Sequence, residues 1–326
     1  MASQKEKKRR KAHQNHQKLK RIIKRRLKCS KQIWQISDAN PNNNSKSDNN
    51  FIDDSIEKKQ YENIGRVGEG ATSITYKLVD KKTRKPLCKK VLKYNNGQTT
   101  IKDAQNALKE FQVLYEIDHP CICKAFFINT SEMIEIVNKN KTEKVTTISI
   151  FLEFLDFSLK EFLSSNFVTN TMKSKIVVEI AHAMNFIHKH NMIHRDLKIE
   201  NIMLNSVLEA KLVDFGLVKI NECVLNEYSY VGESMTKGIG TFAYMSPEML
   251  NEEDYDNKTD VYSFGVVLYF MFIGEIPKQS LKEKTTLKQI KLPSESENIS
   301  LFGLNLIKKC LSPDPAGRPS FEDILN

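Results

Sequence analysis

Three short motifs constrain this 326-residue chain more than any other feature. They are HRDLKIEN at residues 194–201, DFG at 214–216 and GTFAYMSPE at 240–248, and they follow one another in that order. Taken singly, a His-Arg-Asp or an Asp-Phe-Gly tripeptide is ordinary polar turn chemistry. Together, with Asp196 and Asp214 standing 18 residues apart, they make coincidence a negligible explanation.

A glycine-rich element lies upstream, where Gly68 and Gly70 begin a G-x-G-x-x-S sequence. A dinucleotide-binding fingerprint needs a helix directly after the glycines, and a Walker A loop ends in Gly-Lys-Ser/Thr. Here the glycines lead into a second β-like run, SITYKLVD. A β-hairpin that folds over a nucleotide fits this pattern, because glycines without Cβ let backbone N–H groups approach phosphate. The alternative is a simple tight turn.

With these motifs the sequence resembles the eukaryotic protein kinase family from about Tyr61 to Asn326. The resemblance implies an α+β, two-lobed protein kinase fold, with a small antiparallel β lobe that carries one helix and a larger, mainly α lobe. We expect the kinase domain at 58–326, with the small lobe at about 58–153 and the large lobe at about 156–326. Short alternating runs after Tyr61 and helical periodicity after Ser158 agree with this division.

The resemblance assigns roles in the catalytic loop residue by residue. Asp196 resembles the catalytic base that orients a substrate hydroxyl and accepts its proton. Lys198 is expected to offset charge on the γ-phosphate during transfer. Asn201 and Asp214 resemble the ligands of Mg²⁺, which prefers oxygen donors. ATP and Mg²⁺ are thus the expected cofactors, and protein Ser/Thr hydroxyls the expected acceptors.

An ion pair is expected in the small lobe. Lys90 resembles the lysine that positions the α- and β-phosphates, 22 residues after Gly68. Glu110, nine residues before His119, resembles its carboxylate partner. A lysine held in this way is positioned before ATP arrives, whereas a free one is a mobile point charge.

The nucleotide pocket is expected to include further residues of the small lobe and of the hinge. Glu153 and Leu155 resemble the hinge, with Leu152 as gatekeeper and Met203 or Leu204 as an apolar wall. Three small residues depart from the usual pattern of the family: Ser73 replaces a glycine, Thr75 a valine and Cys88 an alanine. The expected nucleotide-binding set is Val67, Gly68, Gly70, Ser73, Thr75, Cys88, Lys90, Glu110, Glu153 and Leu155.

Other matches imply structural roles. Glu248 and Arg318 resemble the ion pair of the large lobe, and Asp260 resembles the aspartate that anchors the catalytic loop. His194 is interpreted as a framework residue. Ala125 stands where the family usually has a bulkier side chain, so we expect a neighbour such as Phe126 to fill the space.

Regulation is expected in the segment from Asp214 to Glu248. Thr236, 12 residues before Glu248, is the strongest phosphosite candidate, with Arg195 and Lys219 as the cationic pocket for its phosphate. A phosphate adds roughly −1.5 to −2 charges and strong acceptor oxygens. The alternative is that Thr236 is an unmodified loop residue.

Local patterns predict several individual elements. Apolar spacing predicts helices around 104–115 and 176–187, and the S-x-x-E spacing of Ser158 and Glu161 predicts a capping box. Residues 121–128 and 146–154 are strand-like, joined by a polar connection. Alternation of Cys121 and Cys123 about Ile122 favours a strand over a metal site.

The net charge of +10 belongs to an N-terminal arm. Residues 1–31 hold 14 Lys and Arg and one acid, whereas the rest carries 36 bases and 39 acids. We expect a basic, helix-prone arm at 1–36 and an Asn-rich flexible linker at 37–57. Import receptors, acidic membrane and nucleic acid remain open as partners of the arm, beside a merely solvated tail.

No charge-free stretch reaches the roughly 20 residues of a bilayer span, and no apolar segment follows the basic start. We therefore expect a cytoplasmic protein, with nuclear location open, that is neither secreted nor membrane-spanning. Six scattered cysteines predict reduced thiols.

Three functional hypotheses remain. An active Ser/Thr kinase leads, because Lys198 and the Gly240-Thr241 pair are typical of that class; DVYSFGVVL favours the tyrosine-kinase-like group. Leu217, directly after DFG, favours serine over threonine as the acceptor. A pseudokinase scaffold and an arm-centred binding protein are the alternatives.

Overall fold

The computed structural model describes residues 54–70, 73–93, 101–138, 141–165, 168–220, 241–277 and 300–326. These residues form two compact units, which we describe separately. Unit 1 comprises the described residues up to 118 together with 124–154, and unit 2 comprises 119–123 and those from 155 onward. The predicted basic arm, most of the predicted linker and Thr236 lie outside the described residues.

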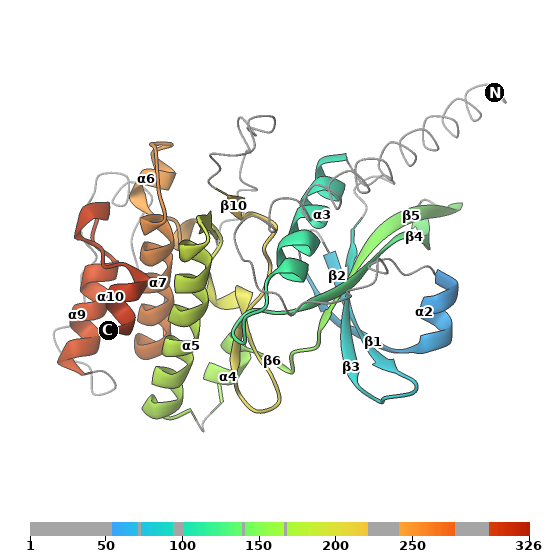
Figure 1. The fold of residues 1–326 in the computed structure, drawn as a ribbon, viewed down its shortest axis with the longest axis horizontal. Coiled ribbons are helices and arrows are strands. Elements are labelled where there is room, and N and C mark those ends of the chain that lie inside the picture. The colour runs from blue at the N-terminus through green and yellow to red at the C-terminus, as the bar shows by residue number, and fades with distance from the viewer. Residues whose placement is uncertain are drawn as a thin grey trace, which may run out of the picture. The chain divides into compact units, whose positions relative to one another are not determined.

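Unit 1 is built on a five-stranded antiparallel sheet of order β1-β2-β3-β5-β4 (Figure 1). In chain order its elements are α2 (Asp54–Gln60), β1 (Tyr61–Glu69), β2 (Ser73–Asp80), β3 (Pro86–Leu92), α3 (Ile101–Glu116), β4 (Ala125–Asn138) and β5 (Lys141–Glu153). The helix α3 was predicted from its apolar spacing, which places Leu108, Phe111 and Leu114 in the core. The helix α2 was not predicted, and it begins within the range expected as linker.

The core of unit 1 includes a cluster of aromatic and leucine side chains from the sheet. Tyr61, Leu78 and Phe151 are buried together, and Leu87 and Phe127 pack against them. The rings of Phe127 and Phe151 lie 4.7 Å apart between centroids. Because these residues come from β1, β2, β3, β4 and β5, one cluster ties all five strands together.

Two local expectations for β4 were wrong. Phe126 does not fill the space beside Ala125, because its side chain is 40% exposed while its neighbour Phe127 points into the aromatic cluster. The polar connection predicted between the strands is instead mostly strand, since Asn138 still pairs with Lys141. Backbone pairing in a hairpin continues without apolar side chains, which is why the pattern did not predict it.

The segment around Cys121 is also less regular than predicted. Only Ile122 forms a bridge, parallel to Leu212, with Cys123 N donating to Leu212 O and Leu212 N donating to Cys121 O at 2.9 Å each. Residues 119–123 therefore belong to unit 2 but form a single β-bridge, at Ile122, before β4 begins. Among the described residues no group of histidine, cysteine and acidic side chains could hold a metal ion.

Unit 2 is mainly helical. Its elements are β6 (Phe157–Ser158), α4 (Leu159–Leu163), α5 (Asn170–Lys189), β7 (Met192–Ile193), η1 (Ile199–Asn201), β8 (Ile202–Leu204), β9 (Ala210–Leu212), β10 (Lys219–Ile220), η2 (Thr241–Ala243), α6 (Pro247–Leu250), α7 (Lys258–Ile273), α9 (Leu301–Cys310), η3 (Pro315–Gly317) and α10 (Phe321–Leu325). Strands β6, β8 and β9 form one small sheet, and β7 pairs with β10. The predicted α+β class is thus confirmed.

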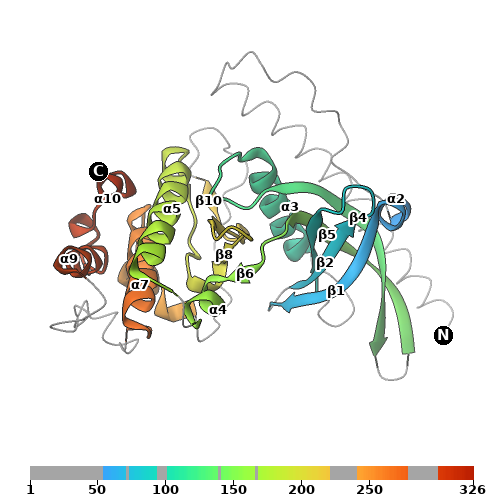
Figure 2. The ribbon, with the colours of Figure 1, turned by 90° about the horizontal axis from the view of Figure 1, so that it is seen from below.

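The helix α7 is the centre of unit 2, and α5 lies beside it in both views (Figures 1 and 2). Nearly all of its side chains are buried, from Thr259 to Met271. Gly265 allows α9 to approach, because a Cβ there would come within 2.8 Å of the Cys310 side chain. Among the helices described, none is both long and apolar enough to cross a membrane.

The start of α4 confirms the predicted capping box. Ser158 Oγ accepts a hydrogen bond from Glu161 N at 3.1 Å, and Glu161 Oε2 accepts one from Ser158 N at 3.0 Å. The two contacts satisfy backbone donors that a helix start leaves free.

Candidate active site

The expected ion pair of unit 1 is present and joins strand β3 to helix α3. Lys90 Nζ lies 2.6 Å from Glu110 Oε1, and the two side chains are 14% and 6% exposed. Leu108, Phe111 and Leu114 bury one face of α3 and fix the rotation of the helix that carries Glu110. The lysine is thereby held in one place by a charge-assisted hydrogen bond.

The glycine turn between β1 and β2 leaves backbone accessible. Gly68 lies opposite Thr75 in the β1–β2 pairing, and a Cβ at Gly68 would come within 2.6 Å of Thr75 Oγ1. Gly70 N donates to Ser73 O at 2.9 Å, which closes the turn, and Ser73 is buried. A larger residue at 68 would require the Thr75 side chain to move, and the exposed side chain of Val67 lies just before this position.

The remaining expected pocket residues lie in β3, at the end of β5 and in the part of unit 2 that follows. Cys88 is paired in register with Leu152, and burial raises the pKa of its thiol to about 11, so this thiol stays neutral. Glu153 ends β5, where its N–H donates to Lys124 O at 2.8 Å. In unit 2, Leu155 and Leu204 are buried and Met203 is half-buried.

The catalytic-loop residues of unit 2 converge on one carboxylate. Asp196 Oδ2 accepts hydrogen bonds from Lys198 Nζ at 2.6 Å and from Asn201 Nδ2 at 2.9 Å. Asn201 Nδ2 also donates to Asp196 O at 2.8 Å. Since the amide nitrogen of Asn201 faces Asp196, its Oδ1 atom is the one suited to a cation.

Two residues beside these contacts have left-handed backbone. Arg195 and Asp214 both have φ of 65°, a conformation that costs most side chains about 1–3 kcal/mol. Phe215, fully buried next to Asp214, meets the His194 ring edge-on at 5.0 Å between centroids. Strain of this kind persists only where surrounding contacts hold it, and here Phe215 links the two motifs.

The buried Asp260 carboxylate at the start of α7 accepts hydrogen bonds from the backbone of the loop at 194–201. Asp260 Oδ2 accepts from His194 N and from His188 Nε2, and Asp260 Oδ1 accepts from Arg195 N, all at 2.8 Å. Burial alone would raise the pKa of Asp260, yet its pKa is lowered, because His188 and the loop donate to its charged form. The expected anchoring role is consistent with these contacts.

His194 is a framework residue in this arrangement. Its side chain is fully buried, and burial lowers its pKa, so the imidazole is neutral. Its Nδ1 accepts from Asp196 N at 3.3 Å, while Nε2 has no hydrogen-bond partner among the described residues. A buried neutral ring in contact with Phe215 serves packing rather than proton transfer.

Arg195 and Lys219 meet at a residue that sequence reasoning missed. Arg195 Nε donates to Leu217 O at 2.6 Å, and its Nη1 donates to Tyr255 Oη at 3.2 Å. The Lys219 ammonium lies 5.3 Å from the centroid of the Tyr255 ring. A lone tyrosine in a polar loop carries no signal that could have predicted this position.

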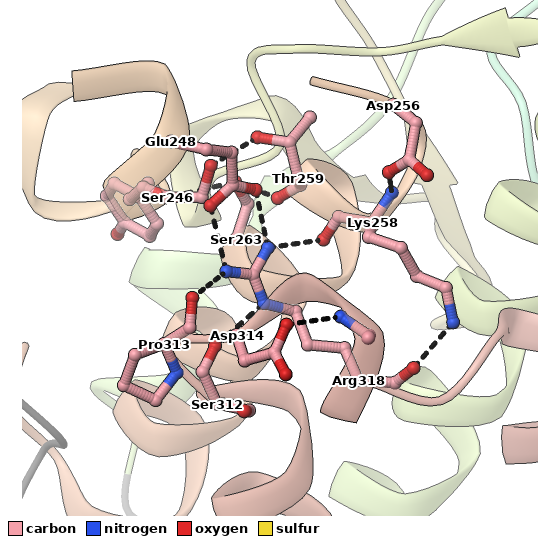
Figure 3. A network of polar contacts seen from close by, with 12 residues as sticks. Ser246, Glu248, Asp256, Lys258, Thr259, Ser263, Ser312, Pro313, Asp314 and Arg318 are labelled. Atoms are coloured by element: carbon pink, nitrogen blue, oxygen red, sulfur yellow. Dashed lines mark hydrogen bonds and ion pairs between the residues drawn. The ribbon is translucent and has the colours of Figure 1, made fainter. Parts of the chain in front are cut away.

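The second expected ion pair joins α6 to the loop before α10 (Figure 3). Arg318 Nη1 and Nη2 donate to the two oxygens of Glu248 at 2.6 and 2.9 Å. The remaining guanidinium hydrogens go to the carbonyl oxygens of Ser312, Lys258 and Pro313 at 2.8 to 3.1 Å. All five donors of a fully buried arginine are therefore satisfied.

Comparison with known proteins gives one consistent match. The model of the family described as "Protein kinase domain" matches residues 61–326. A probable serine/threonine-protein kinase of Dictyostelium discoideum is 30% identical over 288 residues, covering 85% of this chain and 28% of that protein. Serine/threonine-protein kinase 33 of Mus musculus is 27% identical over 293 residues, covering 84% of this chain and 56% of that protein.

A third relative is the mitogen-activated protein kinase kinase kinase dlk-1 of Caenorhabditis briggsae, which is 35% identical over 169 residues. That match covers 49% of this chain and 18% of the relative. The chain thus spans less than a third of the length of the first of these relatives and of dlk-1.

Proposed function

The chain belongs to the protein kinase family, and we propose that it transfers the γ-phosphoryl group of ATP to serine or threonine hydroxyls of protein substrates. A kinase domain implies the use of ATP with a divalent metal ion, and we propose Mg²⁺ as that ion. The observation that supports this proposal most directly is that the Asp196 carboxylate accepts hydrogen bonds from both Lys198 and Asn201.

The proposed mechanism assigns the proton to Asp196. Its carboxylate orients the substrate hydroxyl and takes the proton as the phosphoryl group is transferred. Lys198, 2.6 Å from this carboxylate, is close enough to stabilise the charge that develops on the transferring oxygens. Both groups are fixed before substrate binds, because Asp260 holds the loop backbone.

The proposed nucleotide site uses the ion pair and the glycine turn. Lys90, held by Glu110, contacts the phosphates, and backbone near Gly68, Gly70 and Ser73 covers them. We assign the adenine contacts to Val67, Thr75, Cys88, Glu153 and Leu155. When bound, Mg²⁺ would neutralise phosphate charge; Asn201 and Asp214 supply the amide and carboxylate oxygens that suit it.

We also propose control through Thr236, with Arg195 and Lys219 receiving its phosphate. The support is that both cations lie at Tyr255 in unit 2. Activity of Thr236→Ala after incubation with ATP, combined with mass spectrometry of the segment, tests this. Full activity of the variant, or active enzyme without phosphate there, would contradict it.

The central experiment measures phosphoryl transfer to matched serine and threonine peptides. Asp196→Asn and Asp214→Asn are expected to lower turnover by orders of magnitude, because each removes a charge from the reacting centre. Glu322→Gln, which alters only a surface ion pair with Lys189, is the control and should keep turnover within twofold. Equal turnover of wild type and Asp196→Asn would refute the assignment, and Leu217 predicts a preference for serine.

The alternatives are separable. A pseudokinase usually lacks one of the key charged residues, and this chain keeps Lys90, Asp196 and Asp214.

For the arm at 1–36 we propose a role in localisation through import receptors, acidic membrane or nucleic acid. Identical distributions of tagged full-length and armless protein would leave the arm a solvated tail.

A further inference from the structure

A second buried ion pair lies on β3 and was not predicted. Lys89 Nζ lies 2.5 Å from Glu57 Oε1, and these side chains are 7% and 13% exposed. Asn129 Nδ2 donates to Glu57 Oε2 at 3.2 Å. The two carboxylate oxygens of one residue in α2 thus reach two strands of the sheet, β3 and β4, which lie on either side of β5.

The helix α2 is also fixed at its C-terminal end. Gln60 Nε2 donates to Asp80 Oδ2 at 3.2 Å, and Gln60 O accepts from Lys81 N at 2.9 Å. Lys81 Nζ donates to Lys58 O at 2.8 Å. Figure 2 shows α2 at the start of β1 and close to β4, so the helix is an integral part of unit 1, although the family match begins only at residue 61.

Neighbouring residues of β3 connect this pair to the nucleotide lysine. Side chains of successive strand residues point to opposite faces of a sheet. Lys89 therefore reaches α2 on one face, while Lys90 reaches Glu110 of α3 on the other. The strand is clamped between two carboxylates, one on each face.

Burial makes the α2 clamp demanding. The Lys89 ammonium lies 5.6 Å from the Phe151 ring centroid, next to the apolar cluster of Tyr61 and Leu78. Loss of the Glu57 carboxylate removes a buried ion-pair contact from Lys89 and a hydrogen-bond acceptor from Asn129, so the contacts that hold β3 and β4 to α2 weaken and the strand can shift or admit water. Any shift of Lys89 displaces the adjoining Lys90.

We infer that Glu57 is a positioning residue: through Lys89 it fixes the β3 backbone and so sets Lys90 for the nucleotide. The role of Lys90 in nucleotide binding rests on the proposed function, but the effect of Glu57 on the order of β3 can be tested in nucleotide-free protein. In this way α2 couples the segment that precedes the matched domain to the nucleotide site.

The experiment uses full-length protein and two readouts. Backbone amide exchange of residues 86–92 in nucleotide-free protein reports strand order, and affinity for a fluorescent ATP analogue with Mg²⁺ reports Lys90 placement. Glu57→Gln should speed exchange and weaken affinity at least tenfold each. The matched control is Glu62→Gln, which opens the exposed Glu62–Arg84 pair of the same unit and should change each by less than twofold.

A rescue variant separates positioning from general damage. Glu57→Gln combined with Lys89→Met removes both charges of the pair and keeps an amide oxygen that can accept from Asn129 Nδ2, and neutral replacement of a buried ion pair is often tolerated. Both readouts should return to within threefold of wild type. The inference is overturned if Glu57→Gln matches wild type, or if the double variant stays as impaired as Glu57→Gln. If wild type does not bind the analogue, the proposed function fails, while the exchange pattern still decides the clamp.

Discussion

The two units hold their buried charges in different ways. In unit 1, Lys89 and Lys90 each meet a carboxylate through one ammonium nitrogen, and the Lys90 side chain keeps 14% exposure. In unit 2, Arg318 is fully buried and shares five hydrogen bonds between Glu248 and three carbonyls. An ammonium is a compact charge that can turn toward another anion, whereas a guanidinium fork locks its partners in one plane.

The difference matches what each unit has to do. A phosphate-binding lysine must exchange interactions when nucleotide arrives, so a partly accessible point charge suits it. A pair that holds α6 to the loop before α10 has nothing to exchange. Under the proposed function, the same chemistry, a buried cation with a carboxylate, serves positioning in unit 1 and architecture in unit 2.

The largest expected effect comes from breaking the Arg318–Glu248 ion pair of unit 2. Arg318→Met leaves the Glu248 carboxylate buried without its partner and three carbonyls without donors. We expect the free energy of unfolding to fall by about 3–5 kcal/mol, measured by denaturant titration. Arg318→Lys should recover little of it, because an ammonium cannot reproduce the fork. Lys309→Met, at an exposed position of α9, is the control, and its free energy of unfolding should change by about 0.5 kcal/mol or less, as for a typical surface substitution. A loss below about 1 kcal/mol in Arg318→Met would contradict the assigned role.

The Lys90–Glu110 pair of unit 1 should show the opposite result, a large loss of activity with a smaller loss of stability. Lys90→Met is expected to slow phosphoryl transfer on the order of 10²–10³-fold, the usual effect of removing one stabilising donor. Its free energy of unfolding should fall by less than that of Arg318→Met, about 1–3 kcal/mol, because the change removes one ion-pair contact of the buried Glu110 side chain where Arg318→Met removes five hydrogen bonds. Denaturant titration beside peptide phosphorylation checks both halves. A large stability loss with unchanged turnover would reverse the comparison.

The sequence predicted contacts well wherever a motif fixed both partners. The contacts of Lys90 with Glu110, of Glu248 with Arg318 and of Asp260 with the loop at 194–201 are all present as expected. Each of these residues lies in or beside a motif whose spacing determines its place in the fold. Their contacts can therefore be predicted from the motifs and their spacing in the sequence.

The α2 clamp could not be predicted in the same way. Glu57 lies in a seven-residue helix with no apolar periodicity, inside a stretch that is polar enough to look like linker. Lys89 looks like one more charged residue of a basic strand. Only the folded sheet brings them together, 32 residues apart in sequence. Phe126 was misplaced for a related reason, since its choice of face depends on the register of β4.

A smaller effect is expected from Asp260→Asn. The carboxylate accepts from His188 Nε2, His194 N and Arg195 N, whereas an amide has one acceptor oxygen and turns its NH₂ toward a donor. At least one buried N–H then lacks a partner, which costs about 1–3 kcal/mol. Denaturant titration should show that loss, together with reduced turnover from a displaced Asp196. Asp256→Asn, at an exposed site before α7, is the control and should keep wild-type turnover.

The smallest expected effect is a pH dependence that belongs to unit 2. Residues 54–118 and 124–154 contain no histidine, whereas unit 2 holds His119, His182, His188, His190 and His194. Burial lowers the pKa of His194 below its usual 6.5, against the opposing effects of Asp260, Asp196 and Asp214. Below pH 6.5 the unfolded chain therefore binds the proton that folded His194 refuses, and stability falls as pH falls.

His194→Phe tests this, because a phenyl ring keeps the contact with Phe215 and cannot titrate. In metal-free protein, the free energy of unfolding of wild type should fall between pH 6.5 and 5, with at most about 1.4 kcal/mol per pH unit from this site. The variant should have a shallower slope, though not a flat one, because burial also lowers the pKa of His119. Asp260 cannot produce this slope, since a carboxylate with a lowered pKa loses its stabilising charge only as pH falls below about 4. Equal slopes in wild type and variant would mean that His194 titrates normally and that its burial does not resist protonation.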